Sequence, residues 1–414
     1  MGTAATGPIN GTPPGGAPSG SMPTGHNGGG QAQPGNQRGG GMAGSSSSGA
    51  ASQSGTSTGT STSTTTGTDD SNKSLHQKGR SKIPWSKDVW DRIDQAVEHE
   101  VKRTRVCARF LPKRPVPPKT TSVPTDAYSA SAPPNPVLTV DEGATTRLCE
   151  YYVEFELTPQ QVDQEEADFK QLGHSTAVTL ATKAANTLAQ AEDLIILQGQ
   201  NATSTTALAA VGAVVPIVGS TLFSQGYVLT LNNTSPSDTG LLDFPIGKNV
   251  PPGAGDQVPT NPVPPLVPVN PLAGPPPGVI YGSGTFAAVS NAYSKLQAAG
   301  HYGPYALVLE TIPYADTYAP LSDLTVTADR IKPLMTAGFF GTGTLPPNPP
   351  PPPVAPYYGV MVSLGGNSMD LVVGLEPMAA FMQEDTNGNF RFRVLERFAL
   401  RIKDPTAIVI LQFN

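Results

Sequence analysis

The run DTNGN at residues 385–389 places oxygen-bearing side chains at alternate positions, as the first half of a calcium-binding loop does. The twelfth position counted from Asp385 is Glu396, where such a loop carries its bidentate carboxylate. Glu396, however, lies inside FRFRVLERF, a strand-like run, whereas the calcium loop needs flanking helices. An Asn-Gly turn between two strands explains the same residues, so we predict a hairpin here.

The other residue types that carry out chemistry are scattered. None of the five histidines lies at a metal-ligand spacing from a cysteine or a second histidine. Glu376 and Glu384 could be drawn as a catalytic carboxylate pair, but no feature places them in a cleft, and we interpret them as surface charges. Nucleophile-elbow, Walker A and dinucleotide-binding motifs are absent from the sequence. We therefore predict that the protein is not an enzyme and uses no cofactor or metal.

One turn has a distinctive composition. Tyr302, Gly303, Pro304 and Tyr305 come directly before a short apolar run. Aromatic residues beside a glycine could line an opening or an interface between subunits. A tight turn whose two tyrosines pack on the core explains the same residues, and the sequence alone leaves both interpretations open.

Composition and charge narrow the class of protein. The 414 residues carry a net charge of −6. Four basic and two acidic residues give residues 1–80 a charge of +2, which leaves −8 for the remainder. This balance argues against a nucleic-acid partner.

The first residues lack the basic and apolar regions of a secretory signal, and the longest apolar stretch, 207–219, is too short to span a bilayer. We expect a soluble cytoplasmic protein whose two cysteines, Cys107 and Cys149, are buried thiols.

Residues 1–80 are expected to form no core. Gly, Ser, Thr and Pro dominate them, and Arg38 is the one charge before residue 68. Such a segment buries too little apolar surface to offset the entropy of ordering. We predict a disordered head, which is either a neutral spacer or an interaction tail.

The first ordered elements can be predicted from periodicity. Apolar residues at spacings of three and four indicate a helix from the N-cap Ser86 to about Arg109. The proline-dense segment that follows, to residue 141, favours an extended arm. In residues 148–157, apolar and polar side chains alternate as in a half-buried strand. Glu150, Glu154 and Glu156 are predicted to face solvent. A long helix closes at Gly199, and its apolar stripe consists of Ala177, Leu180, Ala181, Ala184, Leu188, Ala191 and Ile195.

The second half of the chain is predicted to alternate helices and strands around two proline-rich insertions. The insertions are 203–278, with no core of its own, and 346–356. We predict helices at 286–300 and 326–337, a buried strand at 306–309, and further strands at 360–364, 370–375, 390–402 and 407–413. This order indicates an α+β fold with an antiparallel component.

Several stretches, in this order, resemble the encapsulins, also called linocin- or bacteriocin-type shell proteins. The similarity covers roughly 84–201 and 279–413. Its motifs are W-x-x-I-D at 90–94, YYVEFEL at 151–157, AQAEDLIILQGQ at 189–200, GHYGPYALVLE at 300–310, VSLGGNSMDLVVGLEPMAAF at 362–381 and FRVLERFALRIKDPTAIVILQF at 392–413. Each motif alone is modest, and the series with its spacing is fairly specific.

The resemblance implies a phage-capsid (HK97-type) fold and an icosahedral shell of identical subunits that encloses a cargo enzyme, a peroxidase or a ferritin-like protein. The implied parts are a disordered head (1–80), an N-terminal helix (81–110), an extended arm that laces neighbours (111–147), a peripheral domain with the long helix (148–202), the proline-rich insertion (203–278), an axial domain (279–365) and C-terminal strands of the peripheral domain (366–414). Cargo is implied to dock through a short tail in an inner-wall groove. Positions that match this groove are Ile93, Val97, Arg109 and Phe110.

The chain also departs from the family pattern. An 80-residue head is not typical, and the segment after Phe110 is Leu-Pro-Lys-Arg-Pro rather than an acidic, glycine-bearing stretch. Two other classes are compatible with parts of the sequence. A prophage or viral capsid protein would share the fold but needs a basic inner surface, and a cell-surface structural protein needs a secretion signal.

Overall fold

The structure is a computed structural model. It describes residues 79–130, 138–172, 175–199, 202, 222–223, 226–231, 240–242, 265–272, 279–320, 325–345 and 357–413. The predicted head, apart from its last two residues, and most of both proline-rich insertions lie outside the described residues.

Helix α2 (Lys87–Thr104) is the predicted N-terminal helix, and its apolar face is buried. Trp90 at its start contacts Trp85 and Phe392, with ring centroids 5.0 and 6.1 Å away. The helix ends five residues before the predicted Arg109, and a single 3-10 turn (Cys107–Arg109) follows. Because the Asp193 carboxylate accepts hydrogen bonds from the Val106 and Cys107 N–H groups, the chain turns here instead of continuing the helix.

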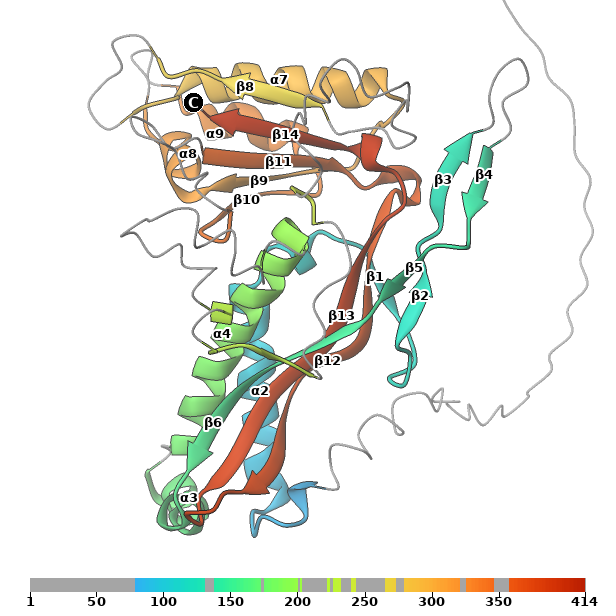
Figure 1. Ribbon diagram of the computed structural model, residues 1–414. Coiled ribbons are helices and arrows are strands. Elements are labelled where there is room, and N and C mark those ends of the chain that lie inside the picture. The colour runs from blue at the N-terminus through green and yellow to red at the C-terminus, as the bar shows by residue number, and fades with distance from the viewer. Residues whose placement is uncertain are drawn as a thin grey trace, which may run out of the picture. The chain divides into compact units, whose positions relative to one another are not determined.

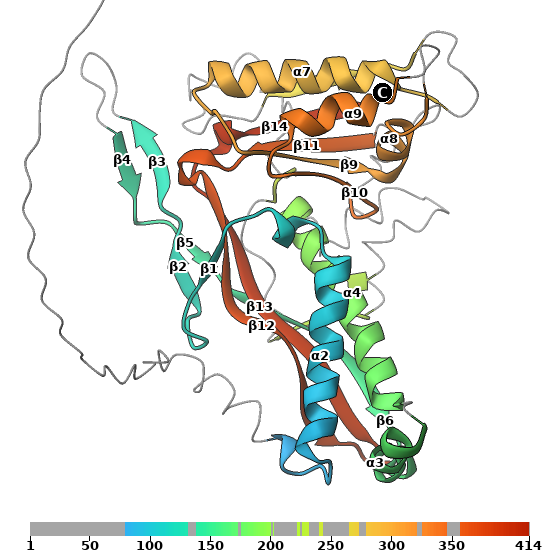
Figure 2. The same ribbon diagram turned by 180° about the vertical axis from the view of Figure 1, so that it is seen from behind.

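The first sheet has the strand order β1-β12-β13-β6-β7. Its strands are β1 (Lys113–Pro115), β12 (Met369–Glu384), β13 (Phe390–Ile402), β6 (Cys149–Leu157) and β7 (Leu229–Thr230). Helices α2 and α4 (Thr176–Gln198) lie side by side over one face of the long strands (Figures 1 and 2). The predicted capping glycine, Gly199, ends α4 with a positive φ of 53°. Helix α3 (Pro159–Leu172), between β6 and α4, was not predicted.

Strands β12 and β13 pair antiparallel and are joined at residues 385–389. Asp385 Oδ1 accepts hydrogen bonds from the N–H groups of Asn387 and Asn389, both at 2.8 Å. The backbone of Gly388 has a φ of 79°, which glycine adopts readily. The predicted hairpin is confirmed.

The second sheet has the order β10-β9-β11-β14-β8. Its strands are β10 (Gly338–Thr342), β9 (Tyr305–Glu310), β11 (Tyr357–Ser363), β14 (Ile408–Phe413) and β8 (Leu266–Val269), and the accompanying helices are α7 (Ser283–Ala298), α8 (Thr311–Asp316) and α9 (Thr327–Ile331). In β9, Ala306 and Val308 join the main core, whereas Leu307 and Leu309 join a second core with α7. The sheet is therefore buried on both faces along β9.

The second half differs from the predictions in two places. The final strand, β14, pairs with β11 and β8, so residues 366–414 do not all belong with the first sheet. In the insertion 203–278, Val267 and Val269 of β8 are buried in the core of the second sheet, which is not a core of the insertion itself. Strand β10 lies where the predicted helical stretch 326–337 ends, and it was missed because its sequence, GFFGT, contains two glycines.

The predicted exposure of Glu150 in β6 is also wrong. Glu150 is buried and forms ion pairs with Arg393 and Arg397 of the neighbouring strand. Alternation along β6 does place Glu150 opposite the helices, but arginines from β13 cover that position. Cys107 and Cys149 lie in the main core, as predicted, rather than in a disulfide.

Candidate functional site

The described residues between Leu111 and Leu148, which are 112–130 and 138–147, contain no helix, as the prolines of this arm predict. Its root strand, β1, pairs parallel with β12 at residues 371–373. The arm then forms two separate two-stranded ladders, β2 (Ser122–Pro124) with β5 (Thr145–Arg147) and β3 (Ala127–Ala130) with β4 (Leu138–Asp141). Figure 1 shows these ladders beside the ends of β12 and β13.

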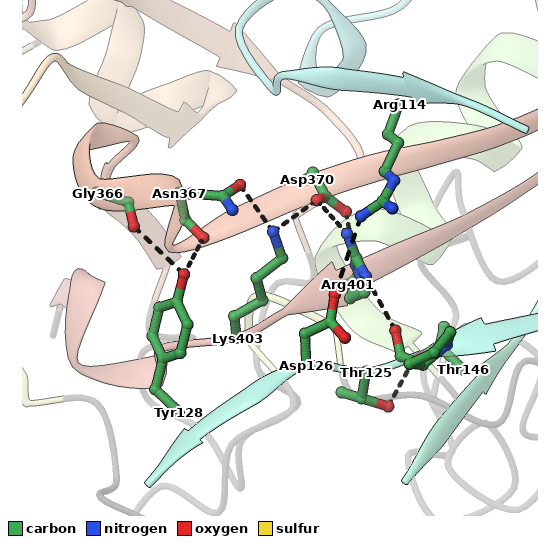
Figure 3. A network of polar contacts seen from close by, with 11 residues as sticks. Arg114, Thr125, Asp126, Tyr128, Thr146, Gly366, Asn367, Asp370, Arg401 and Lys403 are labelled. Atoms are coloured by element: carbon green, nitrogen blue, oxygen red, sulfur yellow. Dashed lines mark hydrogen bonds and ion pairs between the residues drawn. The ribbon is translucent and has the colours of Figure 1, made fainter. Parts of the chain in front are cut away.

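A buried network of charges joins the arm to the first sheet (Figure 3). Its centre is Arg401 of β13, whose side chain is 1% exposed. Arg401 donates to both carboxylate oxygens of Asp370 on β12, from Nε at 2.9 Å and from Nη2 at 2.6 Å. Its Nη1 reaches the arm, where it donates to the Pro124 carbonyl at 2.9 Å and to the Asp126 carboxylate. One guanidinium therefore binds sheet and arm together.

Lys403, the residue directly after β13, completes the network. Its Nζ lies 2.9 Å from Asp370 Oδ2 and donates to Asn367 Oδ1 at 2.7 Å. The Lys403 carbonyl accepts a hydrogen bond from the Tyr128 N–H of β3 at 2.9 Å. We call Asp126, Asp370, Arg401 and Lys403 the arm anchor.

Burial alone would raise the pKa of Asp370, but hydrogen bonds from Arg401 and Lys403 outweigh burial and hold that pKa below its usual value. Hydrogen bonding to Asp370 likewise raises the pKa of Arg401. Asp370 and Arg401 are thus charged at neutral pH. A buried charge whose partner is removed costs about 3–5 kcal/mol, so the anchor strongly favours one arm position.

Beyond the anchor, the outer hairpin β3–β4 carries apolar side chains that the described chain does not cover. Leu138 is 74% exposed and Val140 is 45% exposed. A two-stranded hairpin is marginally stable by itself in water. These two neighbouring apolar side chains make the hairpin a candidate contact surface.

The four residues matched to a cargo groove do not form one surface. Ile93 and Val97 are 1% and 0% exposed and belong to the main core. Phe110 is also buried, and it stacks on Phe340 of β10 with ring centroids 5.7 Å apart. Arg109 alone of the four is exposed, with its guanidinium 5.1 Å from the Phe340 ring. Ile93 and Val97 therefore serve packing, since a helix face that covers a sheet offers no free surface.

The two tyrosines of the turn at 302–305 differ in burial. The sequence left open whether they pack on the core or line an interface. Tyr305 is buried, contacts Tyr293 and donates its hydroxyl to the His301 carbonyl at 2.6 Å. Tyr302 is 76% exposed. Gly303 has a φ of 85° and precedes Pro304, and its N–H points to Ser363 Oγ at 3.3 Å. The core explains Tyr305 and leaves Tyr302 unexplained.

The remaining residues singled out by sequence do not converge. Glu376 is a half-exposed partner of Lys113, at 2.9 Å, and of Arg105, at 3.7 Å. Glu384 lies at the far end of β12. Within the described ranges, no group of three or more His, Cys, Asp or Glu side chains is placed to hold a metal. No helix among those residues is both long and apolar enough to cross a bilayer.

Sequence reasoning missed the arm anchor. Arg401 and Lys403 share their parity along the chain with Arg391, Arg393 and Arg397, so the alternation gives no sign that Arg401 is buried. The partner Asp126 could not be identified from a local pattern either, because it lies 275 residues earlier in the chain.

Comparisons with known proteins agree with the resemblance drawn from the sequence. The model of a family described as "Encapsulating protein for peroxidase" matches residues 76–223 and 281–399, more than half of the chain. The type 1 encapsulin shell protein EncA of Myxococcus xanthus is 35% identical over 130 residues, 31% of this chain. The chain spans 42% of the length of that curated relative.

Similar solved structures are particle and phage proteins. A virus-like particle from Pyrococcus furiosus matches with 15% identity, a TM-score of 0.46, and coverage of 78% of this chain and 98% of that one. A protein of Mycobacterium phage Ogopogo matches with 14% identity, a TM-score of 0.46, and coverage of 75% of this chain and 92% of the other.

Proposed function

Because the chain belongs to the encapsulin family of shell proteins, we propose that it is the subunit of a hollow, self-assembling shell. Identical subunits are its main partners, and the shell encloses a cargo protein in the cytoplasm. A subunit of this kind needs large interfaces and long connecting segments, and it needs no active site. We therefore assign it a structural role rather than a catalytic one.

The exposed outer hairpin is the observation that carries this proposal. Leu138 and Val140 lie on β4, a strand whose four residues are all exposed, and they are available for contact with a neighbouring subunit. The arm anchor holds the same arm at a fixed place on its own subunit. An arm that is held on its own subunit at Pro124 and Asp126 and is apolar at its end is suited to reach a second copy of the chain. Its ordering cost on docking is low because much of it is already extended.

Tyr302 is the proposed second contact between subunits. Its side chain projects from the turn that precedes β9, with its neighbour Tyr305 fixed in the core. Fixing one side of a turn limits the positions of the exposed ring, so little entropy is lost when a partner covers it. We assign this turn to the contacts around a symmetry axis of the shell.

Cargo docking is proposed near the end of α2 through Arg109, whose exposed guanidinium can pair with an acidic group or carboxylate of a short tail. Ile93, Val97 and Phe110 support that region from the core instead of contacting the tail. A protein cargo suits the charge of −8 on residues 81–414, which disfavours nucleic acid.

The head is proposed to lie inside the cavity. Limited proteolysis of intact particles tests this, since rapid loss of residues 1–80 would place the head outside.

Electron microscopy and mass photometry of the purified full chain test assembly. Uniform hollow particles are expected, and a monomer at micromolar concentration contradicts the proposal. The double variant Leu138→Ser/Val140→Ser should lose most particles yet unfold at nearly the same temperature, because exposed substitutions change stability by roughly 0.5 kcal/mol or less. Tyr227→Ser, an exposed apolar residue outside the arm, is the matched control and should assemble normally.

A further inference from the structure

A second group of buried charges lies where α2 ends and the arm begins. Strand β13 places Phe392, Val394 and Phe398 in the main core, and Glu396 has the same parity. Glu396 is 2% exposed, at a position where the pattern calls for an apolar side chain. A break in an otherwise consistent pattern, with no evident structural gain, marks a residue that needs a functional explanation.

Glu396 is one of three buried acids in this place. Glu192 and Asp193 of α4 are each 2% exposed. Asp193 is satisfied by the N–H groups of Val106 and Cys107. Glu192 Oε2 and Glu396 Oε1 are buried and have no hydrogen-bond partner among the residues that the structure describes. A buried carboxyl oxygen without a hydrogen bond favours the neutral form of its group, because burying a charge is costly.

A single buried cation faces these acids. Arg105, the residue after α2, places Nη1 3.9 Å from Glu192 Oε2 and 3.7 Å from Glu376 Oε2 of β12. Glu376 in turn pairs with Lys113 of β1, the first strand of the arm. We call residues 105–113 the arm root. Arg105 and Lys113, its first and last residues, share Glu376, so the state of Arg105 affects how the arm leaves the sheet.

The pKa values follow from this imbalance. Burial raises the pKa of Glu192 to about 8, against the lowering effect of Arg105, and Asp193 raises it further. Burial and the nearby Glu192 raise the pKa of Glu396 well above its usual value. Burial raises the pKa of Asp193 to about 6, although hydrogen bonds from Cys107 and Val106 oppose the change. With a pKa of about 8, Glu192 thus holds its proton at neutral pH, and the raised pKa of Glu396 favours its neutral form as well.

We propose that Glu192 and Glu396 form a proton-operated clamp on the arm root. While both carboxyl groups are neutral, Arg105 is available to Glu376 and holds the root on β12. Loss of their protons places two like charges against one guanidinium in a buried space, which draws Arg105 away from Glu376 and admits water. The arm root then loosens. The effect on assembly rests on the proposed function, since the clamp would release the arm that reaches the neighbour.

The direction of the pH effect is fixed by linkage. A carboxyl whose pKa is higher in the folded than in the unfolded state binds more protons when folded, so stability falls as pH rises from about 4.5 through the folded value. For Glu192 this window ends near pH 8, and the raised pKa of Glu396 acts in the same direction. Acid therefore tightens the clamp, and mild alkali opens it.

Thermal unfolding of the full chain between pH 6 and 9.5 tests the clamp. The wild-type midpoint should fall by roughly 3 °C per pH unit for each proton released. Glu396→Gln and Glu192→Gln should each lose the share of this slope that their own carboxyl contributes, and Glu396→Leu gives the same information if an amide does not fold there. Glu98→Gln, an exposed change on α2, should retain the full wild-type slope.

Hydrogen exchange separates the clamp from a general effect of pH. After correction for the intrinsic rate, amides of residues 105–113 should exchange at least tenfold faster at pH 9 than at pH 7 in wild type and not in Glu396→Gln, while β9 amides stay protected in both. Equal slopes in wild type and variants, or an arm root with unchanged exchange, would overturn the proposal. Absence of particles at pH 7 would defeat the shell function and leave the clamp untouched.

Discussion

The arm anchor and the clamp bury similar side chains with opposite electrostatic results. In the anchor, Arg401 and Lys403 face Asp370 and Asp126, so cations and anions are equal in number. At the clamp, Glu192, Glu396 and the neighbouring Asp193 are buried near Arg105, so the acids outnumber the buried cation. The pKa of Asp370 is lowered and that of Glu192 is raised, although both carboxyl groups are almost inaccessible to solvent. The difference shows that the balance of partners, and not burial itself, decides whether a buried acid is charged.

Arg401→Met breaks the balanced region and should have the largest effect. It removes the guanidinium that joins Asp370 to Asp126, and it leaves both carboxylates without their main partner. We expect a loss of about 3–5 kcal/mol in the free energy of unfolding. Urea unfolding at pH 7 measures this loss. Lys183→Met, an exposed change on α4, should alter stability by no more than about 0.5 kcal/mol, and equal effects of the two variants would refute the role of the anchor.

Glu396→Leu changes the acid-rich region and should act in the other direction. Leucine fits the parity of Phe392, Val394 and Phe398 and removes an acid that has no hydrogen bond at Oε1. Replacing buried charged groups by packed apolar ones is often neutral or stabilising by about 1–4 kcal/mol. The gain, measured by urea unfolding, should be larger at pH 9 than at pH 6. A loss of stability at both pH values would contradict the assigned electrostatic cost.

Asp370→Asn sharpens the comparison through acid. Because the pKa of Asp370 is lowered in the folded state, its ionised form contributes stability above about pH 3.8, and this contribution is lost as pH falls below that value. Wild type should therefore lose up to about 1 kcal/mol more per pH unit below pH 4 than Asp370→Asn does. Unfolding midpoints between pH 3 and 6 give the two slopes. Asp88→Asn, exposed on α2, should keep the wild-type slope.

Local patterns were sufficient for most single elements. The alanine and leucine stripe that ends at Gly199 identifies α4, and the Asn-Gly turn at 385–389 identifies the hairpin between β12 and β13. The family was also recognisable from motifs in order. What these patterns share is that their cause lies within a few residues along the chain.

The missed features have causes far apart in the sequence. Whether β14 pairs with β11 or continues the sheet of β13 depends on partners some 50 residues away, which no periodicity records. The apolar face of α2 was correctly identified, but the same pattern describes a face against a sheet and a face toward a ligand, so Ile93 and Val97 were given the wrong role. Glu396 was predicted to lie in a strand, but its shared parity with the apolar residues Phe392, Val394 and Phe398, which places it on the buried face, was not used.

Asp126 stands between β2 and β3 with a φ of 57°, a conformation that few residues other than glycine and Asn or Asp adopt. Its carboxylate is held by Arg401, and Arg114 of β1 lies 3.9 Å away. This one residue therefore forms a bend, which we call the elbow, that determines the direction of the outer hairpin. A strand of four residues is about 13 Å long, so a turn of about 10° at the elbow moves its tip by roughly 2 Å. In a closed shell, a change of this angle would change the angle between neighbouring subunits. The backbone conformation of Asp126 would therefore affect the diameter of the shell.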